Sequence, residues 1–342
     1  MEKNRIREVT DQVTGQVLEH GAEHIRSKVT EHVTSRSTEV GTDYGFVKEA
    51  DALLADYQLN LSDFALFLSV MKNKRAYECT LSIILDEPDI KLAEVKVEQV
   101  VLNRSGKRAI RLDAWAQSED NRLFDMEMQN DAEADNLPKR ARFYQSMLDT
   151  PILKSGKETR YKQLPSTVII FITQDDIFGK DLAKYTFTEQ CEEVEGLRLE
   201  DGTTKIFLNM TSKNGRKELI SLLQYMKETN IENPEILVKD ERILELDTIV
   251  TEVKESEEWE AVRMNILEIG IAKGREEGKE EGRKQGREEG RKEGREQGKA
   301  EGALLMLVNL VKSGTITIQV AAEQAKMTEE EFEKLLDNNI NQ

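Results

Sequence analysis

Two short alternating segments joined by a polar turn constrain the fold of this chain more than any other feature. The segment from about Ala109 to Ala116 alternates apolar and polar residues, and so does the segment from about Arg122 to Met128. Between them lies QSEDN, a polar cluster that is typical of a hairpin loop. Because strand side chains alternate between the two faces, this pattern predicts paired strands whose apolar face packs on a core.

The polar face of the predicted hairpin carries two carboxylates at matching positions. Its residues are Arg111, Asp113 and Trp115 in the first strand and Asp125, Glu127 and Gln129 in the second. If the strands pair, Asp113 approaches Glu127, and two carboxylates so placed repel unless a positive group lies between them. Mg²⁺ suits this position, because it takes oxygen ligands, often from one or two carboxylates, and keeps several waters.

The motif and its flanks resemble a known nuclease family. RLDAWA, a turn and FDMEMQ resemble the D…ExQ form of the PD-(D/E)XK nuclease motif, and more narrowly the bacterial recombination-promoting nuclease (Rpn) family of transposase-like proteins. FLSVMKNKRAYECTLSIIL resembles the leading helix of that family, LPKRARFYQSML its R…Y helix, and YKQLPSTVIIFIT its following buried strand. The likeness runs from about Tyr44 to the C-terminus.

This resemblance implies an α/β fold with a restriction-endonuclease-like αβββαβ core, helices on a mixed sheet, and a long C-terminal helical extension. It implies a metal-dependent DNA endonuclease (a hydrolase of phosphodiester bonds), linked to recombination or mobile elements, with Mg²⁺ or Mn²⁺ as cofactor. The implied catalytic residues are Asp113, Glu127 and Gln129. The implied metal ligands are Asp113, Glu127 and the backbone carbonyl of Met128.

Gln129 departs from the commoner motif, which has Lys at this position. A lysine supplies a cation that orients water and stabilises the transition state, whereas glutamine forms hydrogen bonds but carries no charge. The competing hypothesis is therefore a catalytically degenerate nuclease fold that binds DNA or assembles with other chains. In that case Asp113 and Glu127 are strand carboxylates paired with Arg111 or Arg122.

Three further residues are candidates for the site, each with a structural alternative. Glu78 lies in the leading helix, where some relatives place a metal-binding Glu, and a surface Glu is the alternative. Arg140 and Tyr144 are i,i+4 neighbours that the resemblance suggests as substrate-binding residues, and a packed Tyr beside a solvated Arg is the alternative. His20 and His24 share a helical spacing, but a solvated helix face is favoured over a metal site.

The remaining pattern divides the chain into four parts. Residues 1–43 form a polar, partly helical segment, and residues 44–240 form the nuclease-like domain, which contains the fully apolar predicted strand Ser166–Thr173. Residues 241–302 are a charged helix with Gly at every fourth position from Gly270 to Gly302. Residues 303–342 form a small helical module similar to a helix-turn-helix.

The glycine repeat has two interpretations. Each glycine costs about 0.8–1 kcal/mol against alanine in a helix, and each i,i+3 ion pair returns about 0.2–0.5 kcal/mol. One interpretation is close backbone contact with a partner, through which the tail mediates self-association. The other, which we favour, is a solvated spacer.

Composition bounds the partners and the compartment. The formal net charge of −17 opposes a general nucleic-acid coat, but the basic groups at 72–75, 104–111 and 139–142 allow a locally basic cleft for DNA. No run of residues is apolar enough to span a membrane, and the first residues carry no apolar signal region. With two cysteines and no CxxC, a cytoplasmic protein with reduced thiols is expected.

Overall fold

In a computed structural model of the protein, the structure describes residues 59–101, 109–130, 135–153 and 160–338. The chain separates into two compact units, and among the described residues the first comprises 59–273 and the second 274–338. The N-terminal segment 1–43, with His20 and His24, lies outside the described residues.

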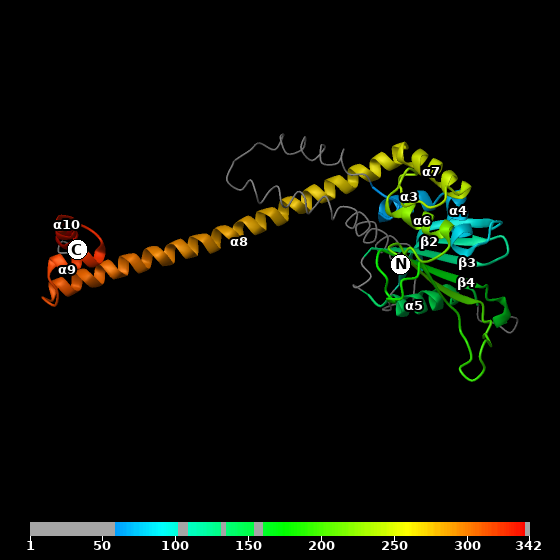
Figure 1. Ribbon diagram of the computed structural model, residues 1–342, viewed down its shortest axis with the longest axis horizontal. Helices are drawn as coiled ribbons and strands as arrows, with labels where there is room; N and C mark the ends of the chain where they lie inside the picture. Colours follow the sequence, from blue (N-terminus) through cyan, green and yellow to red (C-terminus); the bar gives the residue numbers. More distant parts are fainter. Residues whose placement is uncertain (1–58, 102–108, 131–134, 154–159, 339–342) are drawn as a thin grey trace, which may run out of the picture. The chain divides into compact units, whose positions relative to one another are not determined.

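The first unit is built on a six-stranded mixed sheet (Figure 1). The strands are β1 (Leu92–Val101), β2 (Ile110–Ser118), β3 (Leu123–Gln129), β4 (Thr167–Thr173), β5 (Lys184–Phe187) and β6 (Thr203–Asn209). Their order across the sheet is β1-β2-β3-β4-β6-β5. β1, β2 and β3 pair antiparallel, β3, β4 and β6 pair parallel, and β5 returns antiparallel to β6.

Helices cover both faces of this sheet. They are α3 (Phe64–Met71), α4 (Lys74–Leu85), α5 (Leu137–Asp149), α6 (Lys217–Lys227) and α7 (Glu241–Lys254), with a short 3₁₀ turn at Tyr161–Gln163. α5 lies on one face, and α3, α4, α6 and α7 gather on the other (Figure 1). β4 runs between these layers, so all seven of its residues are buried, as the continuous apolar run predicts.

The cluster beneath α5 explains where this helix docks. Its apolar side chains pack with those of the central strands; the buried members are Ile110, Leu112, Leu137, Ala141, Tyr144, Met147, Leu148, Ile169, Phe171, Tyr185 and Phe207. The start of α5 is fixed locally, because the Asn136 side chain accepts a hydrogen bond from the Lys139 N–H and Pro138 occupies the first turn. The helix therefore presents a predictable face to the sheet.

The order helix, three strands, helix, strand confirms the predicted αβββαβ core on a mixed sheet. The leading helix is interrupted, because the Asn73 side chain caps a new helix, α4. The helix expected from residue 241 onward is also divided: the Ser256 hydroxyl accepts a hydrogen bond from the Trp259 N–H and starts another helix. The strand β6 pairs antiparallel with the four-residue strand β5, which the sequence patterns do not predict.

The second unit contains the end of a long helix and two short ones. Helix α8 runs from Glu257 to Lys312, followed by α9 (Ile318–Ala325) and α10 (Glu329–Asn338). Their small core consists of Val308, Ala321, Ala322, Phe332 and Leu336. The Thr328 hydroxyl and the Glu331 carboxylate cap α10 reciprocally, as the sequence predicts.

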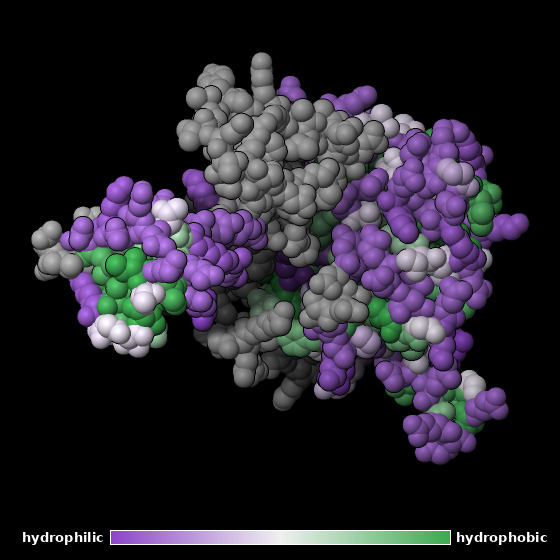
Figure 2. All heavy atoms as spheres, turned by 60° about the vertical axis from the view of Figure 1, so that its left-hand side comes forward, coloured by the Kyte–Doolittle hydropathy of each residue, from purple (hydrophilic) through white to green (hydrophobic). Residues whose placement is uncertain are grey.

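The surface of the second unit is polar along the helix and more apolar near the C-terminus. Figure 2 shows hydrophobic side chains on the visible face of the C-terminal helices. Leu305, Met306 and Val320 are among the exposed apolar residues of this unit. Across the described part of the chain, no helix combines the length and apolar character that a membrane span requires.

Candidate functional site

The two motif strands part beside two carboxylates of the hairpin, Asp113 and Glu127. The β2–β3 ladder runs from Gln117–Leu123 to Ala114–Met126 and stops one pair before them. Beyond that point side chains replace the backbone pairing. The Asp113 N–H donates to Glu127 Oε1 at 2.8 Å, and the Met128 N–H donates to Asp113 Oδ2 at 3.2 Å. Each carboxylate is thus held by the other strand, as the hairpin register predicts.

Both carboxyl groups are removed from solvent. Asp113 is 4% exposed and Glu127 is fully buried. Burial raises the pKa of Asp113 well above its usual value, and the charge of Glu127 raises it further. Burial also raises the pKa of Glu127, against the opposing effects of Arg140 and the Asp113 N–H. The pair therefore gains from any positive charge brought to it.

Arg140 of α5 provides a positive charge at this point. Its Nη2 donates to Glu127 Oε2 at 2.5 Å, and its Nη1 donates to Gln129 Oε1 at 2.9 Å. Its Nε donates to the Tyr144 hydroxyl at 2.9 Å. The guanidinium also lies over the rings of Tyr144 and Phe171, 5.0 and 5.5 Å from their centroids. The structure thus brings four sequence-predicted residues together: Glu127, Gln129, Arg140 and Tyr144.

Asp125 is a third buried carboxyl group that the sequence analysis placed on this face but gave no role. It is fully buried, and neither of its oxygens has a hydrogen-bond donor among the described residues. Burial and the charges of Glu127 and Asp113 raise its pKa well above the usual value. The signal for it was available in the sequence, since Asp125 lies two residues before Glu127 in an alternating strand.

The predicted alternation fails at one end of β2. Trp115 packs against the cluster beneath α5, as expected for the face of Asp113. Arg111, however, lies over the ring of Phe64 in α3, 5.4 Å from its centroid, while Leu112 joins the cluster beneath α5. The β2 strand parts from β3 here but stays paired with β1 as far as Ile110, and Glu98 in the neighbouring β1 has a positive φ of 52°.

The two arginines proposed as partners in the non-catalytic hypothesis have different surroundings: the charge of Arg111 lowers the pKa of Asp113 and of Glu127, whereas Arg122 binds other carboxylates. Arg111 lies 3.6 Å from the Glu98 carboxylate, and Arg122 binds Glu87 at 2.8 Å and Asp120 at 2.9 Å. The ion pair of Glu127 is with Arg140 instead. The sequence could not rank these arginines, because α5 reaches the strand only after the chain has folded over the sheet.

Glu78 has structural contacts outside this group. Its Oε1 accepts the Leu92 N–H at 3.0 Å, which fixes the start of β1. Its Oε2 lies 3.5 Å from Arg75 and 3.8 Å from Lys91. The structure therefore does not bring Glu78 together with Asp113 and Glu127, and these contacts give its predicted role as a ligand no support.

The donor set at the site suits a hard divalent cation. Three buried carboxyl groups lie near one another here, and the oxygens of Asp125 have no hydrogen-bond donor among the described residues. A divalent cation would offset the repulsion between their negative charges. No group of three or more His, Cys, Asp or Glu side chains within the described ranges is already arranged around one cation position. Asp113 and Glu127 offer the carboxylate oxygens that such a cation prefers.

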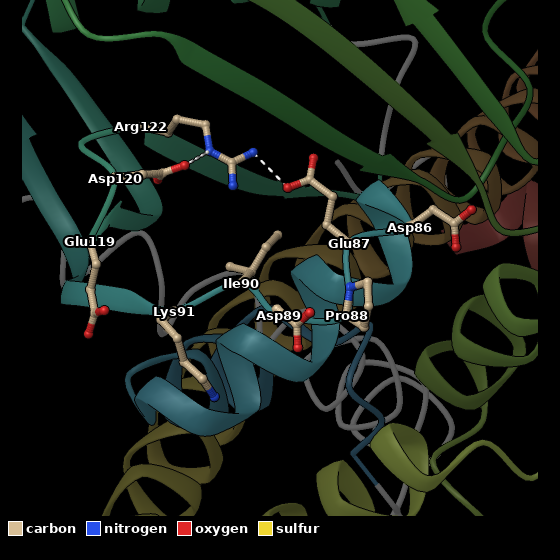
Figure 3. A pocket seen from close by; sticks show the side chains of 9 residues that line it. All are labelled: Asp86, Glu87, Pro88, Asp89, Ile90, Lys91, Glu119, Asp120 and Arg122. Carbon is tan, nitrogen blue, oxygen red and sulfur yellow. Dashed lines mark hydrogen bonds and ion pairs between the residues drawn. The ribbon is translucent and has the colours of Figure 1, made fainter.

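A separate cleft of about 450 Å³ lies between the α4–β1 connection and the β2–β3 hairpin loop (Figure 3). Its lining residues are Asp86, Glu87, Pro88, Asp89, Ile90, Lys91, Glu119, Asp120 and Arg122. In Figure 3 Arg122 reaches from one wall to Glu87 on the other. Asp113 and Glu127 are not among these residues, so the carboxylate site is distinct from this cleft.

Comparison with known proteins agrees with the geometry of the site. No curated protein and no solved structure matches the chain. A family model described as PD-(D/E)XK nuclease family transposase matches residues 62–265, which is more than half of the chain and includes the sheet, α5 and the site. With the D…ExQ residues placed together at the parting of two strands of an αβββαβ core, the chain belongs to the PD-(D/E)XK nuclease family transposases.

Proposed function

We propose that this protein is a divalent-metal-dependent DNA endonuclease, with Mg²⁺ or Mn²⁺ held by Asp113, Glu127 and the backbone carbonyl of Met128. The observation that carries the proposal is the reciprocal placement of Asp113 and Glu127, each buried and each held by an N–H of the opposite strand. Such positioning by backbone groups fixes both carboxylates before a ligand arrives.

The chemistry divides between the cation and the protein. A bound divalent cation lowers the pKa of a coordinated water and neutralises charge on the phosphate. The protein holds the two carboxylates at a fixed separation and buries them, which strengthens electrostatic interactions at the site. Gln129 offers an amide that orients water or a phosphate oxygen by hydrogen bonds. The transposase description of the family supports a role in recombination or mobile elements.

The decisive experiment is cleavage of supercoiled and linear DNA by the full chain in Mg²⁺, Mn²⁺, Ca²⁺ or EDTA. Asp113→Ala and Glu127→Ala are each expected to abolish cleavage, because removing one ligand loses both the activated water and the charge neutralisation. Glu94→Ala is the matched control, since this strand carboxylate is half exposed and forms a surface ion pair with Lys96. An Asp113 or Glu127 variant that folds and cuts at the wild-type rate refutes the assignment.

One observation favours the non-catalytic hypothesis as a second candidate. Glu127 already has a cationic partner in Arg140, so the fold neutralises this charge without a metal. The two candidates differ in their response to cations. A ligand that binds only the folded state stabilises it by about 2.7 kcal/mol at one hundred times its Kd. A melting temperature that rises with Mg²⁺ in the wild type, but not in Asp113→Ala, supports the nuclease, and no rise supports the alternative.

A further inference from the structure

The catalytic motif of this chain lacks the cation that its commoner form carries. Gln129 occupies the position of the motif lysine, and its amide has no charge. A nuclease needs positive charge where negative charge builds on the phosphate, because preorganised charge at that point accounts for a large part of catalysis. The inference that follows rests on the proposed function and concerns where this charge comes from.

Arg140 reaches the position that a lysine at residue 129 would fill. Its Nη1 is 2.9 Å from Gln129 Oε1, and its Nη2 is 2.5 Å from Glu127 Oε2. A lysine side chain is one atom longer than glutamine, so its ammonium would extend from the place of the amide oxygen toward this guanidinium. One arginine therefore bridges both polar members of the ExQ motif from a different element.

The packing around Arg140 holds its charge in place. The side chain is only 23% exposed, the Tyr144 hydroxyl accepts from Nε, and the rings of Tyr144 and Phe171 flank the guanidinium. Burial alone would lower the pKa of Arg140, but the nearby charges of Glu127 and Asp113 help to raise it above the usual value. A planar guanidinium fixed by three hydrogen bonds, one from each of its nitrogens, is preorganised in a way that a surface arginine is not.

We propose that Arg140 supplies the positive charge missing from Gln129, so that in this chain the cation of the nuclease motif is delivered by helix α5 instead of strand β3. Gln129 positions the guanidinium by accepting a hydrogen bond from Nη1, and Glu127 positions it by accepting one from Nη2. The Arg140–Tyr144 spacing places both side chains on the face of α5 that packs on the sheet.

The test removes the positive charge from α5 and places a positive charge at residue 129 in β3. Arg140→Met is expected to reduce kcat for DNA cleavage by roughly 10²-fold or more, as for loss of one preorganised donor in an active site. The double variant Gln129→Lys/Arg140→Met is expected to regain at least about tenfold of that loss, because the ammonium then occupies the vacated place. Arg142→Met is the matched control, an exposed arginine two residues along the same helix.

Whether the loss of Arg140 changes kcat or KM separates this catalytic role from simple DNA binding. A positive charge used at the reacting phosphate lowers kcat when it is lost, whereas a distant phosphate contact raises KM with kcat unchanged. Arg140→Lys keeps the charge without the planar fork, so it should retain more activity than Arg140→Met. Equal activity of Arg140→Lys and Arg140→Met, or a double variant no better than Arg140→Met, overturns the proposal.

A measurement without DNA or metal tests the same placement. In EDTA, Arg140→Met leaves Glu127 buried without its cation, so the melting temperature should fall below that of Arg142→Met. Adding Gln129→Lys should raise it again, because the new ammonium pairs with Glu127; packing by the arginine stem alone predicts no such recovery. If wild type cuts no DNA with any cation, the proposed function fails, while this recovery still decides whether a charge at residue 129 replaces Arg140.

Discussion

Charged residues have different surroundings in the sheet unit and in the long helix. In the sheet unit, arginines distant in sequence meet buried or half-buried partners, as Arg140 meets Glu127 and Arg75 meets Glu245. In helix α8, residues 283–303 are all exposed, and the charges repeat with the glycines at every fourth position. The same residue types therefore form ion pairs with specific partners in the sheet unit, whereas in this part of helix α8 they are exposed to solvent.

The glycines sharpen this contrast. A side chain added at Gly282, Gly286, Gly290, Gly294, Gly298 or Gly302 would meet no atom within 4 Å. In the sheet unit, a side chain at Gly215 would lie 2.9 Å from the Cβ of Ala183. Packing therefore requires glycine at position 215 of the sheet unit, whereas no described contact requires it along this part of α8.

The largest expected difference between the two regions is the response to loss of an apolar side chain. Phe171 is fully buried in β4 and stacks on Phe207 with centroids 5.7 Å apart, so Phe171→Ala should lower the free energy of unfolding by about 3–5 kcal/mol. Leu305→Ala in α8, where the side chain is 53% exposed, should change it by less than about 0.5 kcal/mol. Urea denaturation measures both, and comparable losses would contradict the distinction.

The next effect concerns pH and the buried acid Asp125. Its folded-state pKa is raised, so its contribution to stability is fully present below the unfolded pKa of about 3.9 and is lost as pH rises through the raised value. In EDTA, Asp125→Asn should therefore melt higher than wild type at pH 8, and the difference should close near pH 4. Asp89→Asn, at an exposed site, serves as control. A difference that stays constant with pH would show that Asp125 is not responsible.

A smaller effect is expected from filling the glycine stripe. Gly286→Ala, Gly290→Ala and Gly294→Ala should each stabilise the helix by about 0.8–1 kcal/mol, because alanine loses less backbone entropy and meets no neighbour. Circular dichroism of the full chain measures the gain. Sedimentation of the alanine variants separates the two interpretations of the glycine repeat. Loss of self-association as helicity rises supports close contact between chains at the glycines. Unchanged self-association supports a solvated spacer.

The smallest effect on the sheet unit is expected from removing the tail. Trp259 and Ile266 of α8 are 4% and 1% exposed, so a chain ending after Ile269 retains these buried residues. Deleting Gly270–Gln342 should leave the melting temperature of the sheet unit and its cleavage of DNA unchanged. Calorimetry, the cleavage assay and the mass in solution test this, and loss of the cooperative melt would place part of the tail in the nuclease core.

Local patterns predicted the elements that carry the site. The bounds Leu137–Asp149 of α5 follow from its capping residue and apolar stripe, and β4 follows from a continuous apolar run. β5 was missed because Lys184–Phe187 is short and gains its partner only from β6. The division between α7 and α8 was missed because a serine within a helical pattern does not reveal whether it caps a helix.

The sequence by itself determined that Asp113 and Glu127 meet, because strand periodicity and hairpin register are set by local backbone geometry. Only the tertiary structure decided that Arg140 forms the ion pair with Glu127, while Arg122 binds Glu87 and Asp120. That choice depends on how α5 crosses the sheet, which follows from the packing of its apolar face. The ion-pair partner of a buried charge is the group that tertiary packing places beside it. The residue pattern of a single strand does not predict which group that is.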